Sequence, residues 1–240
     1  MAGIKIKAGA GTGSTELQGP ADTNNVTTLK LPSADGSANQ LLKTDGSGNL
    51  GWATDQGGTI LQVKSASQKD KQSTTADSSD VTGADRLKFH TWGTLITGLS
   101  LTITPADNNN KILIMYDVAL HSSTRYSGIG ISRTPAGGTE VMTAAGDQDG
   151  SIRRRVTKMC PGNPNAGSYT GYEGGFSLSG TYLDDPQSSV ALTYKVYFGN
   201  IAENSNVHTT YVNTNADLTS ADQDYSSSAI STLTIMEVSV

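Results

Sequence analysis

The chain has 240 residues, of which 35% are hydrophobic and 16% are charged, and its net charge is −5. Both fractions lie below those of an ordinary globular domain, and residues that favour turns over helix interiors make up the difference. This composition predicts an all-β protein with many loops. The chain lacks the basic face that a nucleic-acid partner needs, and no apolar run reaches the roughly 18 residues of a membrane span.

The N-terminus and the cysteine content both favour synthesis in a reducing cytoplasm. Residues 1–7 (MAGIKIK) lack the apolar core of a signal peptide, so we expect no Sec export. Cys160 is the only cysteine, which excludes an intrachain disulfide and a cysteine-rich zinc site. We interpret Cys160 as an inert thiol at the end of a strand rather than as a nucleophile.

Residues 1–58 differ from the rest of the chain. Their small and polar stretch 8–14 cannot bury enough apolar surface to order itself. Turn signals at Asp35-Gly36 and Asp45-Gly46 separate short apolar pieces. We predict an extended arm with small β elements that is ordered only against sister chains or a docking partner; the alternative is a flexible tail. The candidate docking residues, which a free tail would expose, are Leu31, Leu41, Leu42, Leu50 and Trp52.

Residues 59–240 have the pattern of one β domain. Its first strand is expected at 60–63, and the polar stretch 65–86 is expected to be a long loop. Alternation of apolar and polar residues at 99–103 predicts a half-buried strand. The nearly continuous apolar stretch 111–120 predicts a central strand that is covered on both faces.

The second half of this domain repeats the alternating pattern. We place Tyr182 and Tyr194 in the core, and no segment shows a helical period of 3.6 residues. Strands separated by turn clusters predict a sandwich or a barrel. Further strands are predicted at 129–131, 176–182, 190–198, 211–212 and 230–240, of which 190–198 is the clearest.

The sequence offers no convincing catalytic or metal-binding constellation. His90, His121 and His208 are far apart, and we expect them to face solvent or an interface. The stretch 147–150 (DQDG) begins like a calcium loop, but its twelfth position is Lys158 instead of the required Glu. We therefore predict no enzyme activity, no cofactor and no protein-bound metal. Turns are the preferred interpretation of three acidic stretches, 147–150, 184–186 and 222–224.

Two groups of residues are candidates for surface recognition. Arg153, Arg154 and Arg155 form, with Lys158, the only basic cluster. They fit contact with an anionic glycan or an acidic subunit, and the alternative is an exposed strand. Aromatic side chains suit stacking on carbohydrate, and the best surface candidates are Tyr169 and Tyr172, which lie in Gly-rich sequence. The other aromatic candidates are Tyr182, Tyr194, Tyr197 and Trp92.

Two groups of short motifs together span most of residues 31–240. In the arm, the motifs are 31–36 (LPSADG), 40–50 (QLLKTDGSGNL) and 52–53 (WA). In the second domain they are 60–63 (ILQV), 97–105 (TGLSLTITP), 110–114 (NKILI), 182–186 (YLDDP), 193–196 (TYKV), 211–213 (YVN) and 230–238 (ISTLTIMEV). Their order and spacing resemble those of tail-fibre and related structural proteins of tailed bacteriophages. The stretches 85–92 and 152–156 depart from the family pattern, and we expect variable loops there.

This resemblance implies a fold, an oligomeric state and a location. The fold is a jelly-roll-like β-sandwich, similar to tumour-necrosis-factor and C1q domains, that forms a homotrimer around a threefold axis. A metal on that axis, held by three copies of one residue, stays an open alternative. The location is the virion, after synthesis in the host cytoplasm.

The resemblance leaves three functions to compare. A tail fibre or receptor-binding tip would dock on other virion proteins through residues 1–58 and contact a host surface glycan or protein through residues 59–240. A capsid decoration protein or head fibre would instead clamp capsomers with the same arm. A polysaccharide depolymerase would need paired carboxylates in a groove, which the sequence does not indicate.

Overall fold

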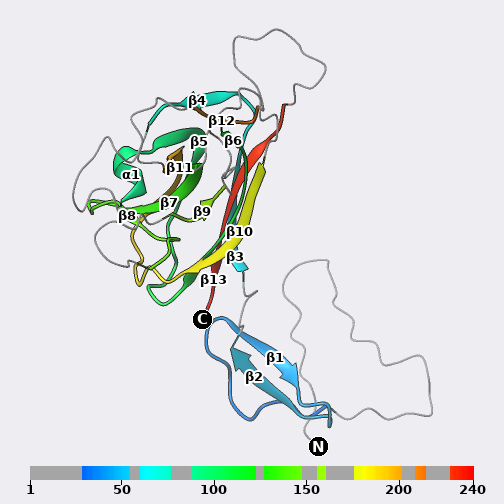
Figure 1. The fold of residues 1–240 in the computed structure, drawn as a ribbon. Coiled ribbons are helices and arrows are strands. Elements are labelled where there is room, and N and C mark those ends of the chain that lie inside the picture. Colours follow the sequence, from blue (N-terminus) through cyan, green and yellow to red (C-terminus); the bar gives the residue numbers. More distant parts are fainter. Residues whose placement is uncertain are drawn as a thin grey trace, which may run out of the picture. The chain divides into compact units, whose positions relative to one another are not determined.

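The computed structural model describes residues 29–54, 60–76, 88–122, 127–147, 156–160, 176–201, 209–214 and 228–240. The chain divides into two compact units, residues 1–56 and 57–240. Figure 1 shows strands in both units and a short helix in the second, so the predicted all-β class is confirmed. The one helix in the described ranges has four residues and cannot span a membrane.

The first unit contains a β-hairpin. Strands β1 (Gln40–Thr44) and β2 (Leu50–Thr54) pair antiparallel, with Leu42 opposite Trp52. The turn between them is fixed by Asp45, whose carboxylate accepts hydrogen bonds from the backbone of Ser47 and Asn49. The hydrogen bonds of the Asp45 carboxylate, the largest from the Asn49 side chain, lower its pKa.

The second unit is built from two sheets. The six-stranded sheet has the order β3-β13-β6-β12-β4, with β10 on the other edge of β6. The five-stranded sheet has the order β5-β11-β7-β8, with β9 also paired to β7. The first sheet comprises β3 (Ile60–Gln68), β4 (Gln72–Thr74), β6 (Lys111–Ser122), β10 (Phe176–Asp184), β12 (Thr210–Val212) and β13 (Ser231–Val238). The second comprises β5 (Thr94–Ile103), β7 (Ser127–Pro135), β8 (Val141–Met142), β9 (Lys158–Met159) and β11 (Leu192–Asn200).

The two sheets pack face to face around one apolar core, which confirms the predicted sandwich. Every second residue of β6 from Ile112 to Leu120 is buried in it. The opposite sheet contributes alternating residues of β7 and β11, including Ile129, Ile131 and Phe198. The Ile–Gly alternation of β7 thus directs its isoleucines between the sheets.

The glycines of β7 and β11 make room for a second, smaller core on the outside of the five-stranded sheet. Helix α1 (Phe89–Trp92) packs there. A Cβ atom on Gly130 would lie 2.6 Å from Cβ of Phe89, and one on Gly199 would lie 3.1 Å from the Trp92 ring. The helix therefore fits only because these outward positions carry no side chain.

Three sequence expectations about secondary structure are corrected. The stretch 65–86 was expected to be a loop, but β3 extends to Gln68 and β4 follows it, because backbone pairing with β13 and β12 organises these polar residues. The stretch 111–120 is covered on one face only, since Met115 and Asp117 are exposed. The described part of 85–92 is no variable loop, because its helix buries Phe89 and Trp92.

The environment of several single residues also differs from expectation. Tyr194 is buried as predicted, but Tyr182 is 40% exposed, because it lies on the edge strand β10. His121 was expected to face solvent or an interface and is buried in the chain, with its ring beside Tyr211. Trp92 and Tyr197 are buried in the outer core and offer no stacking surface to a sugar.

A buried carboxylate ties three distant parts of the sandwich together. Glu237 on β13 accepts hydrogen bonds from Gln62 Nε2 at 2.5 Å, Asn110 Nδ2 at 2.6 Å and the Ala106 backbone N–H at 2.7 Å. Burial acts to raise the pKa of Glu237, but these hydrogen bonds lower it below its ordinary value of 4.5. The loop between β5 and β6 is thereby fixed to β3 and β13.

The first prediction concerns pH. Because the folded-state pKa of Glu237 is lowered, its stabilisation is complete above the unfolded pKa and is lost as pH falls through the folded pKa. We expect Glu237→Gln to cost about 1–3 kcal/mol of unfolding free energy at pH 7, since a charged acceptor is lost, and less below pH 4. Urea unfolding from pH 7 to 3 measures this, with the exposed Asp70→Asn as control. A cost independent of pH would contradict it.

The second prediction concerns the outer core. Gly130→Ala should destabilise the protein by about 1–3 kcal/mol, because the added Cβ overpacks against Phe89. Gly146→Ala is the matched control, since a Cβ there meets nothing within 4 Å. Chemical unfolding of both variants measures the difference in their unfolding free energies. Equal denaturation midpoints would show that α1 does not pack against this strand.

Candidate docking surface of the N-terminal unit

The first unit is organised around Trp52. Its indole Nε1–H donates to the Ala34 carbonyl at 2.9 Å. Gly36 lies against the ring, and a Cβ there would be 2.6 Å from the indole. A further strand-like contact joins Lys30 to the hairpin, because the Lys30 backbone N–H donates to the Gly48 carbonyl and the Lys30 carbonyl accepts from the Leu50 N–H, both at 2.8 Å. Residues 29–36 are thus fixed against β2.

The candidate docking residues are too exposed to be a core. Leu31 is 68% exposed, Leu41 54%, Leu42 46% and Trp52 39%, while Leu50 is half-buried. Leu42 and Trp52 are cross-strand partners on one face of the hairpin, and Leu41 lies on the opposite face beside Ala53. Both faces therefore present apolar surface. An isolated two-stranded hairpin is at best marginally stable in water, so covering these side chains would stabilise it.

The predicted recognition residues of the second unit lie outside the described residues. These are Arg153, Arg154, Arg155, Tyr169 and Tyr172, and with them His208, the stretch 222–224 and most of 147–150. Their roles stay predictions.

The acidic pair at the end of β10 is not a simple turn. Asp184 is buried, and its carboxylate accepts hydrogen bonds from Arg133 Nη1 at 2.6 Å, Tyr194 Oη at 2.7 Å and Thr143 Oγ1 at 2.5 Å. Burial, and then the charge of Asp184, raise the pKa of Tyr194. This network joins β10 to β7 and β11. No local sequence pattern indicates this network, because Arg133 is 51 residues from Asp184.

A second polar network lies on the five-stranded sheet. The Glu140 carboxylate accepts hydrogen bonds from Ser132 at 2.5 Å, Tyr197 at 2.9 Å and Lys195 at 3.2 Å. Burial acts to raise the pKa of Glu140, and these three partners lower it. Neither network sits beside a group of three or more metal-ligating side chains, and no such group occurs within the described residues.

Cys160 directly follows β9, at the end of a strand as predicted, and its side chain is buried. Burial raises its pKa to about 11. The thiolate, which is the nucleophilic form, is therefore scarce at neutral pH.

The third prediction follows from this environment. A disulfide reagent such as Ellman's should label Cys160 of the native protein at least 100-fold more slowly than in 6 M guanidinium, since both burial and the raised pKa protect the sulfur. Stopped-flow absorbance measures the two rates. Equal rates would mean that the thiol is accessible in the native fold.

Comparison with known proteins shows little. No protein-family model matches the chain, and no curated protein matches it. Among solved structures it is similar to infectious bursal disease virus, Gx strain, with a TM-score of 0.37 and 8% identity over 79% of this chain and 34% of that chain. The VP2 subviral particle of the same virus gives a TM-score of 0.34 and 8% identity over 79% and 35%. The chain thus spans about a third of these proteins, and the likeness carries no functional argument.

Proposed function

We propose that this chain is a structural protein of a virion, attached to its particle by the first unit. The observation that carries the proposal is the exposed apolar surface of a hairpin too small to have its own core, at Leu31, Leu41, Leu42 and Trp52. Surfaces of this kind mark sites of protein contact. The motif order that resembles phage tail-fibre proteins supports the virion as the setting, and we place no enzymatic activity on the chain.

The favoured role is a homotrimeric tail fibre or receptor-binding tip. In this role the first unit docks on a tail protein, and the sandwich presents its loops to a host surface glycan or protein. Three copies of a weak site on one assembly would raise the avidity by about 100-fold or more. The alternative role is a capsid decoration protein or head fibre, in which the same surface clamps capsomers. The two roles differ in the location of the docking partner.

The fourth prediction tests docking and location together. We expect Leu41→Ser with Leu42→Ser to lower incorporation into particles by about 10-fold or more, because two apolar contacts of about 1 kcal/mol each are lost. Quantitative immunoblotting of purified particles measures this, and Lys43→Ser on the same strand is the control. Gold-labelled antibodies then locate the wild-type chain on the tail or on the head.

Three outcomes are informative here. Label on the tail supports the fibre, and label across the head supports decoration. Absence of the chain from purified particles, or full incorporation of the double variant, would refute docking through this surface.

A further inference from the structure

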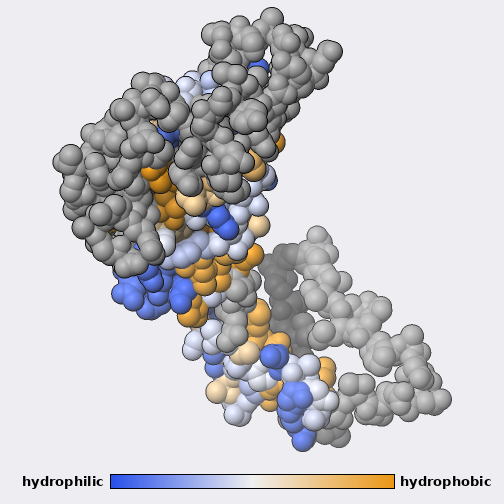
Figure 2. All heavy atoms as spheres, in the orientation of Figure 1, coloured by the Kyte–Doolittle hydropathy of each residue, from blue (hydrophilic) through white to orange (hydrophobic). Residues whose placement is uncertain are grey.

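The side of β10 that faces the opposite sheet is partly open to solvent. Among the described strands, β10 pairs only with β6, and its other edge is bare. Two aromatic side chains on the inner side of β10, Phe176 and Tyr182, are 36% and 40% exposed. Gly180, two residues before Tyr182 on the same side, has no side chain of its own and is partly exposed. Figure 2 shows apolar atoms on the surface where Figure 1 places β10.

Tyr116 of β6 directs its hydroxyl to Gly180. The two residues are cross-strand partners, and a Cβ atom on Gly180 would lie 2.6 Å from Tyr116 Oη. Tyr116 is only 6% exposed, yet its hydroxyl makes no hydrogen bond within the described residues. Burial raises the pKa of Tyr116, so the hydroxyl keeps its proton at neutral pH. A polar group on a buried side chain usually has a partner, because an unmade hydrogen bond costs free energy. This hydroxyl is therefore a donor available to a ligand.

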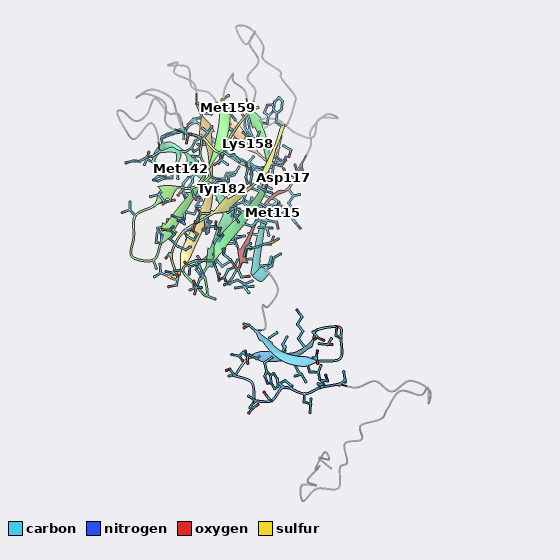
Figure 3. The ribbon with its side chains drawn as sticks, turned by 90° about the horizontal axis from the view of Figure 1, so that it is seen from below. Met115, Asp117, Met142, Lys158, Met159 and Tyr182 are labelled. Atoms are coloured by element: carbon cyan, nitrogen blue, oxygen red, sulfur yellow. The ribbon has the colours of Figure 1, made fainter. Side chains whose placement is uncertain are left out.

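A lysine from the opposite sheet reaches the same point. In the pairing of β9 with β7, Lys158 lies opposite Ile129, whose side chain is in the core, so Lys158 is also on the inner side. Its Cε would lie 3.5 Å from a Cβ on Gly180. Lys158 is exposed and makes no ion pair with any residue that the structure describes. Figure 3 labels Lys158 on β9 and Tyr182 on β10. We call Tyr116, Lys158, Gly180 and Tyr182 the tyrosine–lysine site.

The charge of this site selects a class of ligand. Asp184, on the same side of β10, is neutralised by Arg133 at 2.6 Å, and Asp117 projects to the outer side of the sheet. One ammonium group therefore sets the local charge. A carboxylate matches it, because one oxygen can accept from the ammonium group and the other from the Tyr116 hydroxyl. A phosphate would bring a second negative charge, for which the described residues of the site hold no further cation.

We propose that the tyrosine–lysine site binds the carboxylate of an acidic sugar, with the sugar ring stacked on Tyr182. Gly180 and Tyr182 are two residues apart on one strand, about 7 Å, so a single sugar unit spans the ring and the two donors. An exposed tyrosine offers a rigid apolar face for such a ring. The side chain of an acidic peptide would present the same carboxylate, but it has no ring to place on Tyr182.

The inference deepens the proposed function and rests on it for the source of the sugar, a host surface glycan. It adds the class of sugar, an acidic one, and a place for it between the two sheets. Lys158 is the member of the predicted basic cluster that the structure describes, and Tyr182 was among the aromatic candidates for stacking.

The fifth prediction uses the full chain and small sugars. We expect methyl glucuronide to bind with a dissociation constant on the order of 1 mM. Methyl glucoside carries a hydroxymethyl group in place of the carboxylate and should bind at least about 10-fold more weakly, because the charge-assisted hydrogen bonds are lost. The amide shift of Gly180 in NMR titrations measures both affinities. Equal affinities for the two sugars would overturn the proposal.

Single substitutions remove the two donors in turn. Lys158→Gln should weaken glucuronide binding by about 10-fold, and Tyr116→Phe by about 3-fold or more. Tyr116→Phe should leave urea unfolding unchanged, since the hydroxyl has no partner in the fold. Lys64→Gln, at an exposed position of β3, is the matched control and should bind like the wild type. Undiminished binding by Lys158→Gln would exclude the site, and circular dichroism verifies that each variant is folded.

A third substitution distinguishes a sugar from other carboxylates. Tyr182→Ser should weaken glucuronide binding by about 5-fold and leave acetate binding unchanged, because acetate has no ring to stack. Tighter binding of N-acetylglutamate amide or of methyl glucoside 6-sulfate than of methyl glucuronide would instead assign the site to an acidic peptide or to a sulfated sugar, and either result would refute the proposal.

Adsorption of particles to host cells tests the source of the sugar. Particles that carry Lys158→Gln should adsorb at least about 10-fold less well than wild-type particles with the same amount of the chain, since the loss at each copy is multiplied. Normal adsorption would refute the host glycan as the source. Glucuronide binding by a chain that is absent from particles would refute the virion role and keep the site. A chain that is present on particles but does not bind glucuronide would refute the site alone.

Discussion

The sandwich depends on the hydrogen bonding of β6 along both of its edges. One edge pairs with the whole of β10, from Ile112 to Leu120, and the other pairs first with β13 and then with β12. Between Ile112 and Leu120, buried residues alternate strictly with more exposed ones. Because cross-strand partners share a face, this alternation decides which side of β10, β13 and β12 faces the core. The buried residues from Ile112 to Leu120 fix the inner side, and the same register aligns Met236, Leu113 and Leu183 on the outer side.

The strands with strong alternation were predictable, and those without it were not. The apolar residues at every second position of β11 predicted a strand that the structure contains. The polar residues of β3 near Gln68 gave no such signal, because their strand conformation comes from pairing with β13, more than 160 residues away. One helical turn is too short to show a period, and the burial of Phe89 depends on the space above Gly130.

The candidate surfaces were predictable only where they are local in sequence. The leucines and Trp52 of the hairpin lie within one short stretch that has too few apolar residues for a core of its own. Their exposure could therefore be predicted from the sequence. On the outer side of the six-stranded sheet, the strand register places Val63, Leu113, Leu183 and Met236 side by side, and no local sequence pattern connects them. The buried role of Asp184 was hidden for the same reason, since an acidic pair before a proline is the ordinary signature of a turn.

The position of β13 has a consequence for biosynthesis. It is the last strand in sequence, yet it lies between β3 and β6 in the sheet and supplies the Glu237 carboxylate to Gln62, Asn110 and Ala106. While it is still inside the ribosomal exit tunnel, β3 lacks its only described partner strand, and the side chains of the half-built sheet are open to solvent. We therefore expect productive folding of the sandwich to follow translation of this segment, and the nascent chain up to that point to expose apolar strands of the kind that chaperones bind.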